Sequence, residues 1–173
     1  MGGRPSPDLK IEPLGPHHDR AGFACGVESL DRYLKTQASQ DVKRMANAVF
    51  ILTGLDKPNA ILGYYTLCAA SLAPGDVPLP ARKFVPRYPL VAATLIGRLA
   101  IARERQGEGL GALLLADALR RAYASAGIVG SSMVVVDAIS ERAAAFYEAA
   151  GFVRLPDSLR LVLPTSTIAE LLQ

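Results

Sequence analysis

Three glycines alternate with other residues at positions 107, 109 and 111, between an apolar stretch and a helical pattern. The whole run reads Leu99-Ala-Ile-Ala-Arg-Glu-Arg-Gln-Gly-Glu-Gly-Leu-Gly-Ala-Leu-Leu115. Because glycine has no Cβ, a ligand can approach the backbone here, and several amide N–H groups can converge on an anion at a helix start. The run therefore predicts a strand, a phosphate-binding turn and a helix, and a ligand that carries phosphates.

Two other nucleotide-binding motifs fit this run less well. Gly107-x-Gly109-x-x-Ala112 satisfies the loose dinucleotide pattern, but residues 124–129 lack the acidic residue expected about 20 positions later. The chain contains no Gly-Lys-Ser or Gly-Lys-Thr, which excludes a P-loop. The remaining pattern is Gln106-x-x-Gly109-x-Gly111, and a glycine-rich turn without a ligand stays the alternative.

The length of the chain, 173 residues with half of them apolar, suits one globular domain with a full core. No apolar run approaches the roughly 20 residues of a membrane span, and the first residues lack the apolar core of a secretory signal. We therefore expect a cytoplasmic protein with no membrane partner. Residues 1–8 are predicted to form a disordered tail and residues 9–173 a single domain.

Cysteine and histidine are rare in this chain. Cys25 and Cys68 fit neither a disulfide framework nor a metal-ligand spacing, so we predict no metal and two reduced, half-buried thiols. Cys68 as an acyl-carrying nucleophile would need a base. The chain has two histidines, His17 and His18, and both lie in the N-terminal loop region. We interpret them as a solvated pair and not as a base for Cys68.

Apolar spacing and turn residues predict a mixed α/β domain. Leu30, Leu34 and Ala38 recur at helical spacing and predict one amphipathic helix from about Val27 to Ala46. Five prolines in residues 71–89 predict a surface loop. The other expected elements are strands at 10–14, 48–55, 60–70, 90–101, 133–138, 152–153 and 159–163, a helix at 109–126, a helix capped by Ser140 and a short one capped by Thr165.

Positive charge is concentrated in one part of the sequence. The net charge of +3 is too small to indicate a nucleic-acid partner by itself. Residues 77–103, however, contain no Asp or Glu and carry Arg82, Lys83, Arg87, Arg98 and Arg103. This distribution predicts a phosphate-binding face, with a solvated basic loop as the alternative.

The glycine turn and the order of elements together resemble the GNAT family of N-acetyltransferases over nearly the whole chain. Four segments further resemble the toxins of type II toxin-antitoxin systems that acetylate aminoacyl-tRNA. They are Phe23-Ala-Cys-Gly26 before Leu30-Asp31, Gly63-Tyr-Tyr-Thr-Leu67, Gly97-Arg-Leu-Ala100, and Phe146-Tyr147 ahead of Gly151-Phe152. The resemblance implies a single GNAT-like α/β (α+β) domain. Its mixed central sheet, flanked by helices, would have a V-shaped opening between the strands at 90–101 and 133–138.

The resemblance also implies acetyl-CoA as the cosubstrate. The pantetheine arm would pair with backbone at Leu99 and Ile101, and the pyrophosphate would lie on Gln106, Gly107, Gly109, Gly111 and Ala112. Tyr147 matches the general acid of the family, because a phenol with a pKa near 10 is protonated at neutral pH and can protonate the leaving thiolate. Packing of Tyr147 in the core is the alternative.

The stretch from Leu90 to Ala102 contains no Asp, Glu or His, although many family members place a base there. An α-amine titrates near pH 8 and is partly neutral already, whereas a lysine amine titrates near 10.4. The absence therefore favours an α-amino substrate, with Asp137 and Glu141 as bases that could act through water. A strand-end turn for Asp137 and a helix N-terminal charge for Glu141 are the more economical roles for these carboxylates.

The toxin branch implies direct acetyl transfer to the α-amine of an aminoacyl-tRNA, which would block translation. Arg82, Lys83, Arg87 and Arg98 are the expected tRNA contacts. A small DNA-binding antitoxin and a second copy of the chain, as a homodimer, are the implied partners. Two alternatives remain: acetylation of a small amine or protein N-terminus, and a non-catalytic CoA-binding module.

Overall fold

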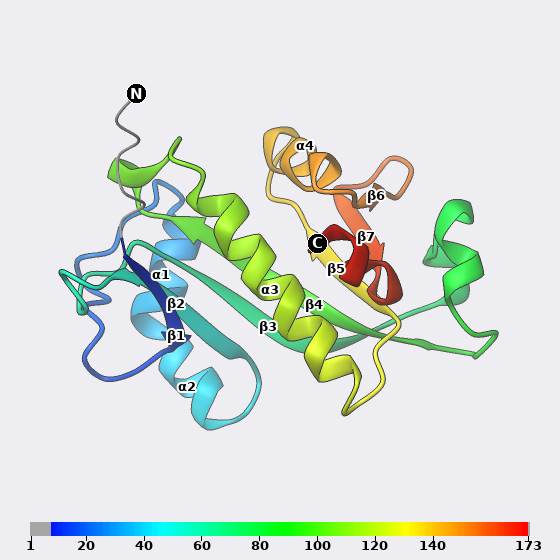
Figure 1. Ribbon diagram of the computed structural model, residues 1–173, viewed down its shortest axis with the longest axis horizontal. Coiled ribbons are helices and arrows are strands. Elements are labelled where there is room, and N and C mark those ends of the chain that lie inside the picture. Colours follow the sequence, from blue (N-terminus) through cyan, green and yellow to red (C-terminus); the bar gives the residue numbers. More distant parts are fainter. Residues whose placement is uncertain (1–7, 173) are drawn as a thin grey trace. The chain divides into compact units, whose positions relative to one another are not determined.

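A computed structural model describes residues 8–172 of the chain (Figure 1). Seven strands form one mixed sheet in the order β1-β2-β3-β4-β5-β7-β6. All predicted strands are present, with ends shifted by at most three residues. Their bounds are β1 (Leu9–Pro13), β2 (Ala48–Gly54), β3 (Gly63–Leu72), β4 (Val91–Ile101), β5 (Met133–Asp137), β6 (Val153–Arg154) and β7 (Arg160–Pro164).

Five α-helices and four short 3₁₀ turns complete the described chain. None of these helices, within residues 8–172, is long and apolar enough to cross a membrane. The predicted tail lies outside the described residues except for Asp8, whose carbonyl accepts a hydrogen bond from the Leu55 amide. The helices are α1 (Glu28–Thr36), α2 (Ala38–Lys43), α3 (Leu110–Ala126), α4 (Glu141–Ala149) and α5 (Ile168–Leu171), and the 3₁₀ turns are η1 (Pro74–Asp76), η2 (Leu79–Phe84), η3 (Arg103–Arg105) and η4 (Thr165–Thr167).

The prediction of one helix over residues 27–46 was wrong, because α1 and α2 are separated at Gln37, where φ is −121°. Asp41 accepts hydrogen bonds at this junction from the Tyr33 hydroxyl (2.8 Å), Gln37 Nε2 (3.0 Å) and Asn47 Nδ2 (3.0 Å). These side-chain bonds stabilise the break. The apolar spacing continues through it, so periodicity alone did not reveal it.

The two predicted helix caps had opposite outcomes. The Ser140 cap of α4 is confirmed, because its Oγ accepts a hydrogen bond of 3.1 Å from the Ala143 amide. The Thr165 cap was wrong: its hydroxyl is buried and has no hydrogen-bond partner among residues 8–172. The Thr165 amide donates to the Ser132 carbonyl at 2.9 Å, which keeps this residue aligned with the end of β7.

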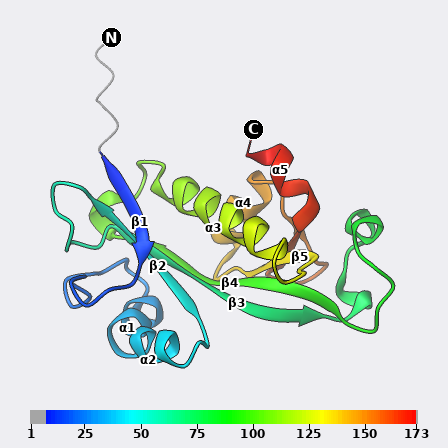
Figure 2. The same ribbon diagram turned by 60° about the horizontal axis from the view of Figure 1, so that its bottom comes forward.

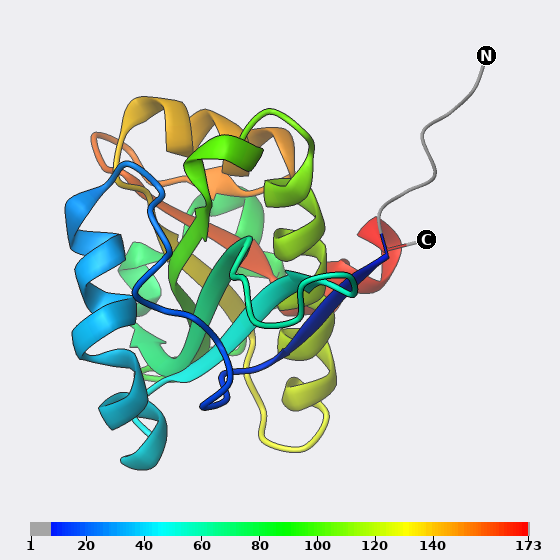
Figure 3. The ribbon, with the colours of Figure 1, turned by 90° about the vertical axis from the view of Figure 1, so that its left-hand side faces the viewer.

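The chain packs as two compact units, residues 8–66 with 98–117 and residues 67–97 with 118–172. In the first unit, α1 and α2 cover one face of β2 and the start of β3, and the first turns of α3 cover the other (Figures 2 and 3). Phe23, Leu34, Ile51 and Tyr64 are buried in its core. The core of the second unit includes Leu72, Val91, Met133 and Val162.

Strands β4 and β5 pair in parallel only over part of β4. The register runs from Ala93 with Met133 to Ile96 with Val136, and β4 continues for five more residues to Ile101. On its other side β5 pairs with β7 in antiparallel register along its full length, from Met133 to Asp137. The parallel ladder ends at Ile96 and Val136, one residue before β5 itself ends at Asp137, and the predicted V-shaped opening stays a prediction.

Candidate functional site

The glycine turn lies in the first unit, between β4 and α3. Gly107 and Gly109 have φ angles of +83° and +81°, a conformation that L-residues rarely adopt. Apart from the glycine itself and its two chain neighbours, no atom lies within 4 Å of the position that a Cβ would take at either residue. Open space therefore borders the backbone at both positions, as the sequence predicts for a ligand-binding turn.

The first turn of α3 adds backbone donors to this space. The amides of Leu110, Gly111 and Ala112 have no hydrogen-bond partner within residues 8–172, as expected at a helix start. No acidic side chain occupies the first turn of this 17-residue helix. Unpaired amides and the helix dipole together make the turn suitable for a pyrophosphate.

Gln106 holds the turn in place. Its Nε2 donates to the Cys25 carbonyl at 2.8 Å and to the Ile101 carbonyl at 3.0 Å. Both N–H bonds of the side-chain amide are therefore used within the protein, so its amide nitrogen positions the turn and is not free to contact a ligand. The Ile101 carbonyl, expected to pair with a pantetheine arm, already accepts this bond, and the side chains of Leu99 and Ile101 are half-buried.

The segment Phe23–Gly26 supports the turn from a distant part of the sequence. The Ala24 carbonyl accepts a 2.8 Å hydrogen bond from the Arg103 amide, next to the Cys25 carbonyl that accepts from Gln106. Gly26 has a φ of +97° and lies against the Arg103 guanidinium. The supporting role of this segment was not predictable from local sequence patterns, because it depends on contacts with residues about 80 positions away.

Tyr147 lies on α4 in the second unit and is 6% exposed. Its ring makes edge contacts with Phe146 and Phe152, with centroid distances of 5.1 and 5.6 Å. Burial raises the pKa of the phenol above its usual value, so the hydroxyl stays protonated at neutral pH. Within residues 8–172 this hydroxyl has no hydrogen-bond partner. The ring of Tyr147 thus packs in the core, as one of the two predicted roles expects. Its hydroxyl is nevertheless free to donate a proton, as the role of general acid requires.

Asp137 and Glu141 are held by arginines in the same unit. Arg160 donates to the two oxygens of Asp137 at 2.7 and 2.9 Å, and Arg154 donates to those of Glu141 at 2.6 and 2.8 Å. The Arg154 guanidinium lowers the pKa of Glu141, which makes this carboxylate a weaker base. These ion pairs favour the ordinary strand-end and helix-start roles of both carboxylates over water-relayed base catalysis.

The second unit brings three of the predicted tRNA contacts together. Arg82, Lys83 and Arg87 line an open groove of about 660 Å³, which we call the basic groove. Arg82 Nε donates to the Val77 carbonyl at 3.0 Å, and Lys83 Nζ lies 5.1 Å from the Phe84 ring centroid. No acidic residue lines the basic groove, whose other lining residues are Pro74, Gly75, Val85, Pro86 and Tyr88.

Arg98, the fourth predicted contact, belongs to the first unit. Its guanidinium carbon lies 3.5 Å from the centroid of the Tyr33 ring, a cation–π arrangement on α1. Burial raises the pKa of Tyr33 to about 12, so this phenol is neutral. The structure thus gives Arg98 a packing contact and does not place it in the basic groove.

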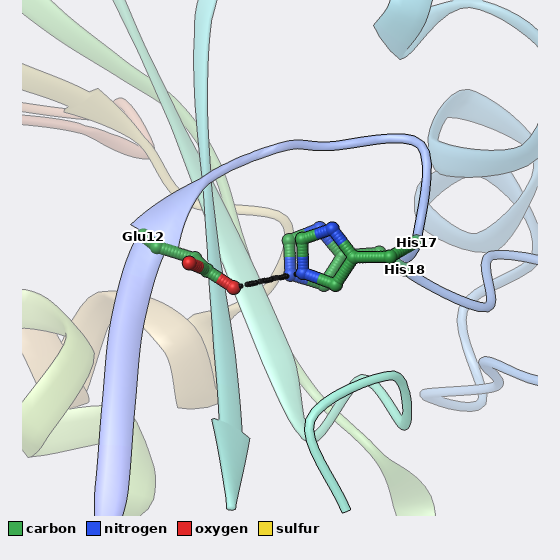
Figure 4. Close-up of side chains that lie close together, drawn as sticks. All are labelled: Glu12, His17 and His18. Atoms are coloured by element: carbon green, nitrogen blue, oxygen red, sulfur yellow. Dashed lines mark hydrogen bonds and ion pairs between the residues drawn. The ribbon is translucent and has the colours of Figure 1, made fainter. Parts of the chain in front are cut away.

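Histidine 18 is buried, so the expectation of a solvated pair was wrong for this residue. Nε2 of His17 and Nε2 of His18 both lie 3.0 Å from Glu12 Oε1 (Figure 4). The Gly15 amide donates to His18 Nδ1 at 2.9 Å, so the ring carries its proton on Nε2 and donates it to Glu12. The Lys10 ammonium pairs with the other Glu12 oxygen at 2.9 Å.

Glu12, His17 and His18 are also a group within residues 8–172 whose ligating atoms all lie within 4.8 Å of one another. A metal on His18 Nε2 would force the ring proton onto Nδ1. That nitrogen could then no longer accept the hydrogen bond that the Gly15 amide donates to it. The contacts therefore favour a structural network that ties β1 to the following loop. The absence of a metal stays a prediction.

The cysteines differ from each other in burial. Cys25 is buried at 7% exposure, not half-buried as expected, and burial raises the pKa of its thiol to about 11. Cys68 is half-buried, as predicted. A raised pKa keeps Cys25 in the unreactive thiol form at neutral pH.

Comparison with known proteins identifies relatives over most of the chain. Residues 57–154 match the acetyltransferase (GNAT) domain family. A tRNA-acetylating toxin of Mycobacterium tuberculosis is 34% identical over 146 residues, 84% of this chain and 85% of that protein. The structure of AtaT complexed with acetyl-methionyl-tRNAfMet has a TM-score of 0.86 at 32% identity and covers 96% of this chain and 100% of that one. A mutant AtaT toxin bound to the C-terminus of the antitoxin AtaR and acetyl-CoA has a TM-score of 0.79 at 30% identity, covering 95% and 97%.

Proposed function

Because the chain belongs to the GNAT acetyltransferase family, we propose that it transfers the acetyl group of acetyl-CoA to the α-amine of an aminoacyl-tRNA and thereby blocks translation. One observation carries the proposal. AtaT, which shares the fold over 96% of this chain, has been solved with acetyl-methionyl-tRNAfMet. The local chemistry of each unit supports the proposal.

The glycine turn is the proposed pyrophosphate site. The open space beside Gly107 and Gly109 and the amides of Leu110, Gly111 and Ala112 fit a doubly charged diphosphate. Gln106 fixes this geometry through its bonds to Cys25 and Ile101. Backbone of Leu99 and Ile101 belongs to the part of β4 beyond its ladder with β5, which suits an arm that pairs like an added strand.

Tyr147 is the proposed general acid. When acetyl-CoA is bound, it supplies the thioester whose leaving group needs a proton. The free hydroxyl and the raised pKa of Tyr147 make it a donor that is fully protonated at neutral pH. Its edge contacts with Phe146 and Phe152 hold the ring, and therefore the phenol oxygen, in place.

The same unit supports the choice of an α-amine as acceptor. Both acidic candidates for a base are in two-pronged ion pairs, Asp137 with Arg160 and Glu141 with Arg154. An acceptor that is already partly neutral needs less help from a base, and an α-amine with a pKa near 8 meets this condition better than lysine.

The basic groove is the proposed contact for the tRNA backbone. Arg82, Lys83 and Arg87 line it without an opposing carboxylate, so their charge is available to phosphates. Arg98 stays a proposed contact only through its remaining guanidinium N–H groups, because its face lies on Tyr33. A small amine would gain nothing from this groove.

Mass spectrometry of charged tRNA after incubation with the protein and acetyl-CoA tests the proposal. We expect an acetyl group on the aminoacyl α-amine. The variant Arg82→Ala/Lys83→Ala/Arg87→Ala should bind charged tRNA more weakly and with a flatter salt dependence, while its acetyl-CoA affinity stays unchanged. Lys43→Ala/Arg44→Ala/Lys57→Ala, which removes three exposed charges of the first unit, is the matched control. Acetylation of free amines or peptides but not of charged tRNA would refute the assignment.

The partners and the location are further parts of the proposal. An AtaT toxin binds the C-terminus of the antitoxin AtaR, so we infer a small DNA-binding antitoxin for this chain as well. A homodimer and a cytoplasmic location, where charged tRNA is found, complete the proposal. The domain assignment is residues 9–173 as one acetyltransferase domain.

A further inference from the structure

Building on the proposed function, we infer that the basic groove binds a single-stranded stretch of RNA and that one unpaired base stacks on Tyr88. The phosphates on either side of this base would contact Arg82, Lys83 and Arg87. Tyr88 would add a base-binding ring to the cations of the basic groove.

Tyr88 is exposed, and it lies in the basic groove with cationic side chains. Its side chain is 63% exposed, although a tyrosine ring buries a large apolar surface when it has a partner. Within residues 8–172 no aromatic ring or cation lies against it, whereas the neighbouring Phe84 ring is covered by the Lys83 ammonium. The uncovered ring lines the basic groove together with Lys83 and Arg87.

The backbone around Tyr88 is restricted before any ligand binds. Pro86 and Pro89 flank the dipeptide Arg87-Tyr88, and each proline fixes its own φ and limits the residue before it. A side chain on a restricted backbone loses less conformational entropy when a ligand orders it. Of the two residues, Tyr88 precedes Pro89, so the backbone that carries its ring is restricted before a ligand binds.

Unpaired RNA is the ligand that uses both features. A duplex exposes phosphates but keeps its bases stacked inside, so it would contact the arginines and leave the ring unused. A single strand presents a phosphate and an accessible base face at each nucleotide, and stacking on an aromatic side chain tolerates any base. An acidic peptide would match the charge, but it would not need the bare ring.

Fluorescence anisotropy with a labelled single-stranded RNA and a hairpin RNA of equal length tests the inference. We expect Tyr88→Ala to weaken single-strand binding about 5- to 150-fold, the range for loss of one stacked base, and to change hairpin binding little. Tyr88→Phe should bind like the parent, since it keeps the ring. Tyr123→Ala is the control, because Tyr123 is 45% exposed on α3 and is not part of the basic groove.

A single strand that contains 2-aminopurine gives a direct signal, because the fluorescence of this base falls on stacking. Equal single-strand affinity of Tyr88→Ala and the parent overturns the inference. Equal losses for both RNAs, or preferential binding of an acidic peptide, do so as well. Binding is measured without turnover, so these outcomes are separate from a failure to acetylate charged tRNA, which would refute the proposed function instead.

Discussion

Replacement of Gly109 by glutamate is the sharpest test of the glycine turn. The φ of +81° at this position costs an L-residue about 1–2 kcal/mol. Beyond its chain neighbours, no protein atom lies within 4 Å of the new Cβ, so this atom adds no clash. At 2–4 °C per kcal/mol for a domain of this size, we expect the melting temperature to fall by roughly 2–8 °C.

The loss of coenzyme affinity should be much larger. A carboxylate about 4 Å from one phosphate charge is repelled by about 4 kcal/mol at an effective dielectric constant of about 20. Salt and solvent screening reduce this figure, because the turn is exposed. A weakening of roughly 10²- to 10³-fold is therefore the expected result.

Calorimetric titration with acetyl-CoA measures the affinity, and thermal unfolding confirms that the variant is folded. Gly109→Ala separates backbone strain and bulk from charge. Gly130→Glu is the control for an added carboxylate, since its Cβ also meets open space and its φ is not in the left-handed region. A folded Gly109→Glu protein with the affinity of the Gly130→Glu control would show that the pyrophosphate does not bind at this turn.

Three further predictions concern single side chains. Tyr147→Phe should lower turnover by roughly 10²-fold or more while acetyl-CoA affinity stays unchanged; CoA thiol release measures this, and near-normal turnover would leave Tyr147 with a packing role only. Glu141→Gln and Asp137→Asn should keep turnover, because both carboxylates are occupied by arginines; a large loss in a folded variant would identify a base. The pKa of Glu12 is lowered to about 2 by hydrogen bonds from Lys10 and His17, and burial lowers the pKa of His18. Both lowered pKa values contribute to folding stability at neutral pH, and both contributions are lost on acidification. The contribution of His18 is lost as the pH falls below 6.5, and that of Glu12 as the pH falls from 4.5 toward about 2. Melting temperatures from pH 7 to 2 should therefore fall, and less steeply below pH 4.5 in Glu12→Gln; equal slopes would contradict the role of Glu12.

The sequence by itself determined the strands, the long helix α3 and the glycine turn. These features depend on neighbours along the chain: apolar periodicity, turn residues and the freedom of glycine at positive φ. Ser140 was predictable as a cap for the same reason, because its hydroxyl bonds an amide three residues away. The family resemblance rested on this local order of motifs.

The tertiary structure decided which side chains remain available for chemistry. Gln106 reaches Cys25 across 81 residues, Arg160 reaches Asp137 across 23, and Arg154 reaches Glu141 across 13. Periodicity carries no information about such pairs, since each depends on where two distant backbones meet. For the same reason the sequence placed His18 in solvent, whereas the fold buries it against Glu12. Hydrogen bonds between residues far apart in the sequence thus separate supporting residues from those free to act on a substrate.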